Sequence, residues 1–242
     1  MILFMRKIRR RLLADSKITK YLIYMIGEIV LIVVGILIAL NIENWNNEKI
    51  TRSTEIAILK EMKKNLKADL LDIRENIKLN KKSLQANELV LKSLSNPSSY
   101  IDSLNFYYAH LFLTTILDVN NSSYENLKSF GFQIIENDNL RIKITELYAI
   151  SYVFLGKMEN VIYSIQSDKI IPLVISNITT DTLYVSARPV DPEALAMNHE
   201  FKESIKLNRE WFRFMVGLYK NTEQEIVELM GQIDNETKNL ER

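Results

Sequence analysis

The sequence predicts an all-α protein, in which one N-terminal transmembrane helix continues into a long helix packed in an elongated antiparallel helical bundle. An apolar run of about one bilayer thickness lies near the N-terminus. Two stripes of apolar residues with a seven-residue repeat follow, one before residue 95 and one after residue 200. The chain has only 6 Gly and 4 Pro in 242 residues, so few residues interrupt helices.

The apolar run Tyr21–Ile42 has the length of a membrane span. Its 22 residues make a helix of roughly 33 Å at 1.5 Å per residue, and a bilayer core is about 30 Å thick. Tyr21 and Tyr24 lie near one end of the run and Trp45 near the other, as interfacial aromatic residues do. The run is too long for the core of a signal peptide, so we predict an uncleaved anchor.

Charge predicts the direction of this anchor. Against the single acid Asp15, the segment before the run carries the basic residues Arg6, Lys7, Arg9, Arg10, Arg11, Lys17 and Lys20. The positive-inside rule therefore places the N-terminus in the cytoplasm, and in a bacterium the bulk of the chain would then be in the periplasm. We divide the chain into a basic cytoplasmic segment at 1–20, a transmembrane helix at 21–42 and a periplasmic helical-bundle domain at 43–242.

The basic segment has two interpretations. Basic side chains next to a membrane attract anionic lipid headgroups, and we expect this of Arg6, Lys7, Arg9, Arg10 and Arg11. A docking site for a cytoplasmic protein is the alternative.

Two apolar stripes of nearly equal length follow the anchor, each with nine apolar residues in twelve heptad positions. The first comprises Ile56, Leu59, Leu66, Leu70, Ile73, Ile77, Leu84, Leu91 and Leu94, with Lys63, Asn80 and Asn87 between them. The second comprises Phe201, Ile205, Phe212, Met215, Tyr219, Ile226, Leu229, Ile233 and Leu240, with Asn208, Thr222 and Glu236. We expect the two helices, each about 60 Å long, to pair antiparallel within one chain. Pairing of each stripe with its own copy in a second subunit is the alternative.

Shorter helices are expected between the stripes. "SNPSSY" ends the first long helix, and a second helix should cover Tyr100–Thr115. Ser122-x-x-Glu125 is typical of a capping box, opening a helix that ends at Gly131. Asn137 or Asp138 should cap the following helix.

Three further signals follow along the chain. Pro172 should end or kink the helix that begins near residue 138. "TTDTLYVSARPVD" is the one stretch that favours an extended conformation. Asp191-Pro192 opens a short helix with Pro at its first position, and from about His199 the chain should be helical to its end.

The sequence offers little for catalysis or metal binding. It has no Cys, 2 His and no hydrolase or nucleotide-binding motif. "DVNNSSYE" places oxygen atoms at alternate positions but lacks the glycine and distant glutamate of an EF-hand loop. We predict a non-enzyme with no catalytic residue, cofactor or metal. The formal net charge of +1 gives no field for nucleic acid.

One acid interrupts the membrane span. An ionised carboxylate near a helix centre costs roughly 2.5–3.5 kcal/mol on insertion scales. Glu28 shares a helical face with Leu31, Gly35, Ala39 and Ile42, and Gly35-x-x-x-Ala39 is a small-residue pair that lets helices approach closely. We predict that this face joins identical subunits and keeps Glu28 mostly protonated. A lone, tolerated carboxyl and a contact with a different membrane protein are the alternatives.

The opening "RKIRRRLL…KYLIYMIGEIVLIVVGILIALNIENWN" resembles a family of small single-pass inner-membrane proteins of Bacteroidota. That family shares a basic start, a G-E-I-x-L-rich span and an N-x-W-N exit. "YENLKSFG" and "NLRIKITELYAISY" resemble its later stretches; Gly131 matches a family glycine, whereas Phe130 stands where a small residue is usual. The resemblance implies an inner membrane with the bulk of the chain in the periplasm, and it implies no activity.

Given that resemblance, two tripeptides are candidates for modification. Asp102-Ser103-Leu104 and Asp181-Thr182-Leu183 resemble the sequon of periplasmic O-glycosylation in Bacteroidota. The resemblance therefore implies Ser103 and Thr182 as candidate glycosylation sites.

Three functions fit these observations. We expect a non-enzymatic, oligomeric, membrane-anchored periplasmic scaffold or accessory subunit of a membrane complex. The first alternative is a periplasmic sensor bundle that signals through a membrane partner. The second is a proton- or ion-conducting element that uses Glu28.

Overall fold

The computed structural model describes residues 17–95 and 101–242 of the chain. The chain divides into two units, Met1–Thr54 and Glu55–Arg242. Helix α2, Lys17–Ser93, contributes residues to both units. The all-α prediction is confirmed, since a single two-stranded sheet accompanies the helices of the described residues.

The described part of the first unit is the N-terminal portion of α2. Every side chain from Met25 to Ile50 is exposed. Among the described residues, α2 is the one helix long and apolar enough to cross a membrane. A helix that is apolar all round and uncovered by its own chain is consistent with a membrane anchor.

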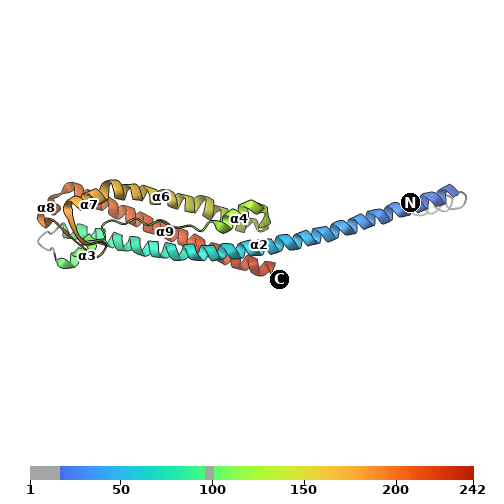
Figure 1. Cartoon of the computed structure of the whole chain (residues 1–242), viewed down its shortest axis with the longest axis horizontal. Helices are drawn as coiled ribbons and strands as arrows, with labels where there is room; N and C mark the ends of the chain where they lie inside the picture. The colour runs from blue at the N-terminus through green and yellow to red at the C-terminus, as the bar shows by residue number, and fades with distance from the viewer. Residues whose placement is uncertain (1–16, 96–100) are drawn as a thin grey trace, which may run out of the picture. The chain divides into compact units, whose positions relative to one another are not determined.

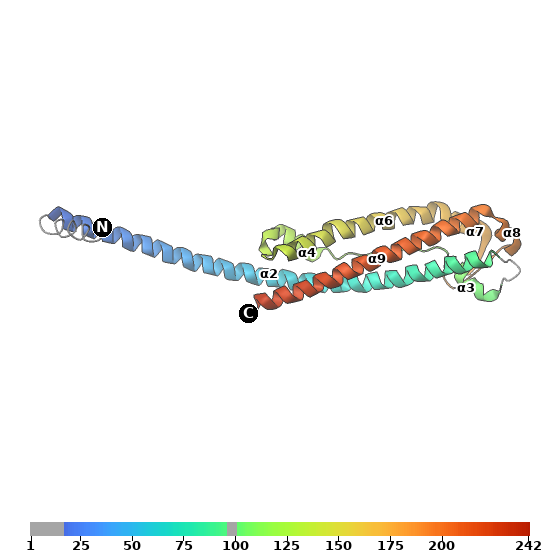
Figure 2. The ribbon, with the colours of Figure 1, turned by 180° about the vertical axis from the view of Figure 1, so that it is seen from behind.

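The second unit is built on a pair of long helices. Helix α9, His199–Leu240, lies alongside α2 in both views of the ribbon (Figures 1 and 2). Ion pairs join Lys60 to Glu241 at 2.6 Å and Arg74 to Glu223 at 2.7 Å. Because residue numbers rise along one helix as they fall along the other, the pair is antiparallel. The predicted intramolecular pairing of the two stripes is confirmed.

The buried face of α2 is wider than the predicted stripe. Leu59, Leu66 and Ile73 are fully buried, as predicted. Other stripe members, such as Ile56 and Leu84, are only half-buried. A neighbouring heptad row is buried instead, and it consists of Glu55, Met62, Asp69, Asn76, Ser83 and Val90. This row was not predicted, because four of its six members are polar.

A third layer explains that row. Its elements are α4 (Ser122–Phe130), the 3₁₀ turn η3 (Phe132–Ile134), α5 (Asp138–Glu146), the π-helical turn η4 (Leu147–Ser151), α6 (Tyr152–Ile165), the π-helical turn η5 (Gln166–Ile170) and α7 (Ile171–Asn177). This layer and the chain leading into it cover the side of α2 that α9 leaves free, and α6 also lies beside α9 (Figures 1 and 2).

Several predicted boundaries in this layer are confirmed. Helix α4 ends at Phe130, and Gly131 follows with a φ of +93°, which a residue with a Cβ rarely adopts. Asn137 caps α5, since its side chain accepts a hydrogen bond from the Leu140 N–H at 3.2 Å. Pro172 does not end its helix. It lies in the first turn of α7, and the backbone stays helical from α6 through the π-helical turn η5 into α7.

The end of the unit farthest from Glu55 holds the sheet. Strands β1 (Ile178–Thr182) and β2 (Ser186–Pro189) form an antiparallel hairpin, so the extended prediction is confirmed. Helix α8, Pro192–Met197, follows with Asp191 as its cap, as predicted.

Two predictions were wrong. The helix expected over Tyr100–Thr115 is only a 3₁₀ turn, η2 (Asp102–Leu104), and one turn of α3 (Asn105–Tyr108). Residues 112–121 then have no regular secondary structure and cross the unit as an extended segment (Figure 1). The capping box at Ser122 is also absent, because Asn121 is the N-cap of α4 and its side chain makes no cap bond.

Candidate functional site

The predicted membrane contact lies on one exposed helix. Glu28, Leu31, Gly35, Ala39 and Ile42 all belong to α2, and each is exposed. A Cβ added to Gly35 would meet no atom within 4 Å. The described part of the chain thus leaves this face open, and its role between subunits stays a prediction.

The other predicted sites lie far apart in the sequence. Ser103 lies in η2 and Thr182 ends β1, and both side chains are exposed. Their glycosylation stays a prediction. The lipid-binding cluster Arg6, Lys7, Arg9, Arg10 and Arg11 lies outside the described residues.

The polar groups that hold the extended segment are internal. The sequence showed Asn80 and Asn87 as interruptions of the first stripe but did not predict what they bind. Amide side chains of α2 donate hydrogen bonds to it at three levels. Asn87 Nδ2 donates to the Leu111 carbonyl at 3.1 Å. Asn80 Nδ2 donates to Thr115 Oγ1 at 2.8 Å, and Asn76 Nδ2 donates to the Ile116 carbonyl at 3.2 Å.

The next turns of α2 supply acceptors instead of donors. The Asp118 N–H donates to Asp72 Oδ2 at 3.0 Å, and the Asn120 N–H donates to Asp69 Oδ1 at 3.1 Å. One more turn along, Asn65 donates to the hydroxyls of Ser122 and Ser123 at 2.8 and 3.0 Å. We call the α2 side chains that bind the segment the polar ladder: Asn65, Asp69, Asp72, Asn76, Asn80 and Asn87.

The polar ladder takes the place of a neighbouring β-strand. A buried backbone must pair its N–H and carbonyl groups, and an extended segment between helices has no strand beside it. Amides of α2 meet the segment's carbonyls, and carboxylates of α2 meet its N–H groups. The side chains therefore determine the register of the segment along the helix.

The ladder extends into the other two layers. Glu159 of α6 accepts from the Leu117 N–H at 2.9 Å and from the Tyr219 hydroxyl of α9 at 2.6 Å. Tyr152 of α6 donates to Asp69 Oδ2 at 2.8 Å. One hydrogen-bonded network thus connects α2, the segment, α6 and α9.

Burial raises the pKa of three acidic side chains in this interior. Desolvation raises the pKa of Asp69 and of Glu159 above the ordinary values, and the hydrogen bonds that each accepts oppose the rise. Desolvation also raises the pKa of Glu55 to about 7, although the Glu136 N–H, 3.3 Å from Glu55 Oε1, opposes the shift. Glu55 therefore titrates near neutral pH.

A second internal cluster joins the two predicted stripes. Asn208 Nδ2 of α9 donates to Asn87 Oδ1 at 3.0 Å and to the Leu111 carbonyl at 2.7 Å. Gln166 Nε2 donates to Asn208 Oδ1 at 2.5 Å. Asn87 and Asn208 were visible in the sequence as polar interruptions of the stripes, and in the structure they meet. Buried amides of this kind can specify the register of a helix pair.

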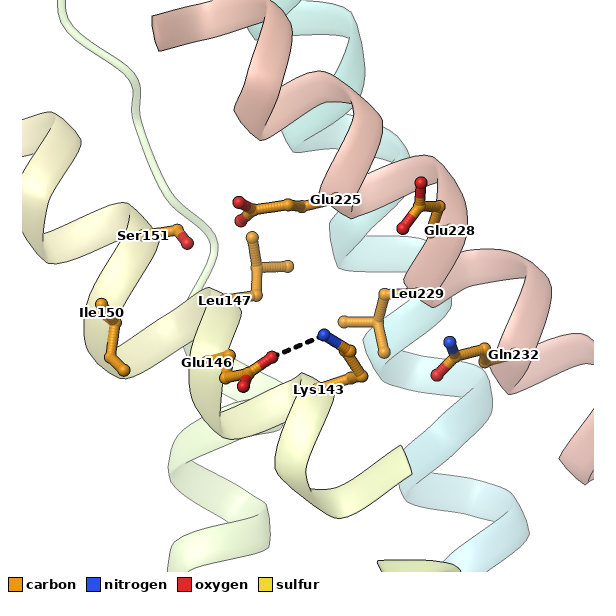
Figure 3. A pocket seen from close by; sticks show the side chains of 9 residues that line it. All are labelled: Lys143, Glu146, Leu147, Ile150, Ser151, Glu225, Glu228, Leu229 and Gln232. Atoms are coloured by element: carbon orange, nitrogen blue, oxygen red, sulfur yellow. Dashed lines mark hydrogen bonds and ion pairs between the residues drawn. The ribbon is translucent and has the colours of Figure 1, made fainter. Parts of the chain in front are cut away.

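A surface cleft lies between the third layer and α9 (Figure 3). Its volume is about 290 Å³, and it is lined by Lys143, Glu146, Leu147, Ile150, Ser151, Glu225, Glu228, Leu229 and Gln232. Lys143 Nζ pairs with Glu146 Oε2 at 2.7 Å across its lower edge in the figure. Glu225 and Glu228 reach it from α9. This volume is at the low end of the range for ligand sites.

Comparison with known proteins places this chain in a family. The family described as "Family of unknown function (DUF6090)" matches residues 28–180. The chain belongs to the DUF6090 family. Its DUF6090 region begins at Glu28, contains the whole polar ladder and Glu159, and ends in β1, before α9. No curated protein and no solved structure matches this DUF6090 chain.

Proposed function

We propose that this DUF6090 chain is a non-enzymatic, membrane-anchored scaffold or accessory subunit of a bacterial inner-membrane complex, assembled as a homo-oligomer with its domain in the periplasm. The polar ladder is the observation that carries the proposal. Four of its six side chains bind backbone groups of the segment and the other two bind side-chain hydroxyls, so the buried polar chemistry of the domain serves to fix three layers in register. A rigid bundle next to an anchor is suited to hold partners at a set position.

Exposed apolar side chains on the third layer support a contact role. Ile150, Val153 and Phe154 follow the i, i+3, i+4 spacing of one helical face, and all three are exposed. Ile150 has 62% of its surface exposed. Exposed apolar rows on a folded domain are typical of protein interaction surfaces.

The Glu28 face gives the sharpest test of assembly. We expect Glu28→Leu and Gly35→Leu each to loosen or shift the oligomer while leaving membrane insertion intact, because the first removes a shared carboxyl contact and the second blocks close helix approach. Native mass spectrometry of the full chain released from detergent measures the change. Val33→Leu, on another face of α2, is the matched control. If both variants and the control run at the wild-type mass, the homo-oligomer does not form through this face.

The sensor alternative is favoured by one observation, the cleft lined by residues of α5, η4 and α9. Crosslinking in native cells, with identification of the captured chains, separates the two functions. Copies of this chain or subunits of a membrane complex would support the scaffold. A membrane protein with a cytoplasmic output domain would support the sensor. The ion-conducting alternative predicts a flux across liposomes that Glu28→Gln abolishes.

A further inference from the structure

One exposed face of α2 within the unit Glu55–Arg242 is strongly basic. Nine positions spaced three or four residues apart, from Lys64 to Lys92, lie on this face, and all nine are exposed. Six are basic, and we call these the basic ridge: Lys64, Lys67, Arg74, Lys78, Lys81 and Lys92. At 1.5 Å per residue the ridge is about 42 Å long. The face has one acid, Glu88.

Four of the six ridge cations have no ion pair among the described residues. Arg74 pairs with Glu223 and Lys78 with Glu75, at 2.7 and 3.2 Å. Lys64, Lys67, Lys81 and Lys92 have no carboxylate within salt-bridge distance in the described part of the chain. The ridge therefore presents uncompensated positive charge.

The ridge differs from an ordinary solvated helix face. Such faces alternate signs, as on α9, where Glu203 pairs with Lys206 and Glu210 with Arg213. On the ridge, like charges stand three or four residues apart, for example at Lys64 and Lys67, and such neighbours destabilise a helix. The composition of the unit does not explain the positive charge of the basic ridge, because residues 55–242 contain 22 Lys and Arg against 26 Asp and Glu.

At its far end the ridge widens into a groove between α2 and α9. Lys92 lines this groove together with Lys202, Lys206 and Arg209. Glu88 and Glu203 also line it, but Glu88 is paired with Arg213 and Glu203 with Lys206. Lys206 and Arg209 are themselves paired with Glu203 and Glu210, so among the described residues Lys92 and Lys202 supply the unpaired positive charge with which the groove continues the ridge.

We propose that the basic ridge binds a linear anionic polysaccharide of the cell envelope. Neighbouring ridge cations are three to eleven residues apart, or about 5 to 17 Å along the helix, and such a line of like charge suits a partner that repeats negative charge along its length. The ridge positions hold no aromatic side chain on which a single-stranded nucleic acid would stack its bases. The choice of an envelope polymer over a nucleic acid rests on the proposed periplasmic placement, whereas the charge argument does not.

The test uses the full chain in nanodiscs of uncharged phosphatidylcholine, so that lipid does not compete. The probe is polygalacturonate, a linear polymer of carboxylates, with dextran as the neutral polymer. The ridge variant is Lys64→Gln, Lys67→Gln and Lys81→Gln together. The control variant, Lys128→Gln, Lys157→Gln and Lys169→Gln together, removes the same charge from exposed positions of the third layer.

We expect wild type and control to bind polygalacturonate but not dextran, with an affinity that falls steeply with salt. The ridge variant should bind roughly 10- to 100-fold more weakly. Absent binding, or an equal loss in both variants, would overturn the ridge as a site. Tighter, ridge-dependent binding of duplex DNA would overturn the polysaccharide. None of these results depends on the oligomer mass, so this proposal and the scaffold can fail separately.

Discussion

Glu55 shows how one side chain can make this domain sensitive to pH. It is 1% exposed and begins the unpredicted polar row of α2. Its carboxyl has a pKa of about 7 in the folded protein, against 4.5 for an unperturbed glutamate. The folded state therefore binds this proton more tightly than the unfolded chain. The stabilising contribution is complete below about pH 4.5 and is lost as pH rises through 7.

Glu55→Gln should therefore stabilise the domain at high pH only. Glutamine mimics the protonated acid, so we expect the variant's free energy of unfolding to match that of wild type at about pH 4 and to exceed it by roughly 1–3 kcal/mol at pH 8. Urea unfolding of the full chain in detergent at the two pH values measures this. The exposed Glu225→Gln is the control and should show no such difference. An equal effect of Glu55→Gln at both pH values would contradict the argument.

The side chain of Asn208 makes hydrogen bonds with three buried groups. Asn208→Leu leaves the Asn87 amide oxygen and Gln166 Nε2 without their hydrogen bonds, and it removes one of the two hydrogen bonds that the Leu111 carbonyl accepts. We expect a loss of about 2–3 kcal/mol in the free energy of unfolding. The exposed Asn221→Leu, 13 residues farther along the same helix, should change stability by less than about 0.5 kcal/mol. Equal effects of the two variants would mean that the cluster is not stabilising.

Among the elements, the extended segment is the one that sequence reasoning could not have foreseen. The segment begins with "FLTTIL" (112–117), a short and mostly apolar run, and such runs do not separate helix from strand by periodicity. The segment's conformation is decided by the polar ladder, whose members Asp69 and Asn76 lie beside the apolar stripe and carry no pattern of their own. By contrast, α9 was predictable, because its apolar stripe runs along almost the whole length of the helix.

Asp69→Ala should loosen that segment. The change removes the acceptor for the Asn120 N–H and leaves the buried Tyr152 hydroxyl unpaired. We expect hydrogen exchange in peptides covering 112–121 to speed up roughly 10- to 100-fold, as local protection is lost. Mass spectrometry of the exchanged full chain measures it, and Asp168→Ala, at an exposed site, is the control. Unchanged exchange would show that the ladder does not hold the segment.

The antiparallel pairing of α2 and α9 predicts which residues lie close together at the end of the pair near Lys60 and Glu241. Cysteines placed at Ile56 and Leu240 should crosslink within one chain through a short bismaleimide, because Lys60 and Glu241 already meet there. The protein has no natural Cys, so the reaction is clean. A cysteine at Leu91 with one at Leu240 is the control and should give no product within one chain. Products found only between chains would indicate an exchange of helices between subunits.

At the scale of the whole molecule, membrane insertion and its direction are still predictions. A reporter fused after Arg242 should be active only in the periplasm, since the basic residues lie before the span. Activity in the cytoplasm would overturn the topology, and with it the glycosylation of Ser103 and Thr182. The two hydroxyls are exposed, so an intact-mass measurement on protein from its native source tests the modification directly.

The overall architecture was predictable from the sequence because it depends on long apolar repeats. Two heptad stripes and scarce breakers were enough to predict α2, α9 and their antiparallel pairing. The interior network was not, because Glu55, Asp69 and Glu159 are single acids whose role appears only once three layers meet. The candidate membrane face around Glu28 was identified from the sequence, and its residues are exposed in the structure.

The pairing of the extended segment with α2 constrains the number of residues in the segment. From Leu111 to Ser122 the segment advances 11 residues, or about 36 Å when extended, while its partners on α2 run back 22 residues, or about 33 Å. One residue of the segment thus corresponds to two of the helix. An inserted residue would move every later group two helix positions, a turn of about 200°, onto the far side of α2. The segment resembles a loop in conformation, yet it cannot gain or lose a residue as loops do.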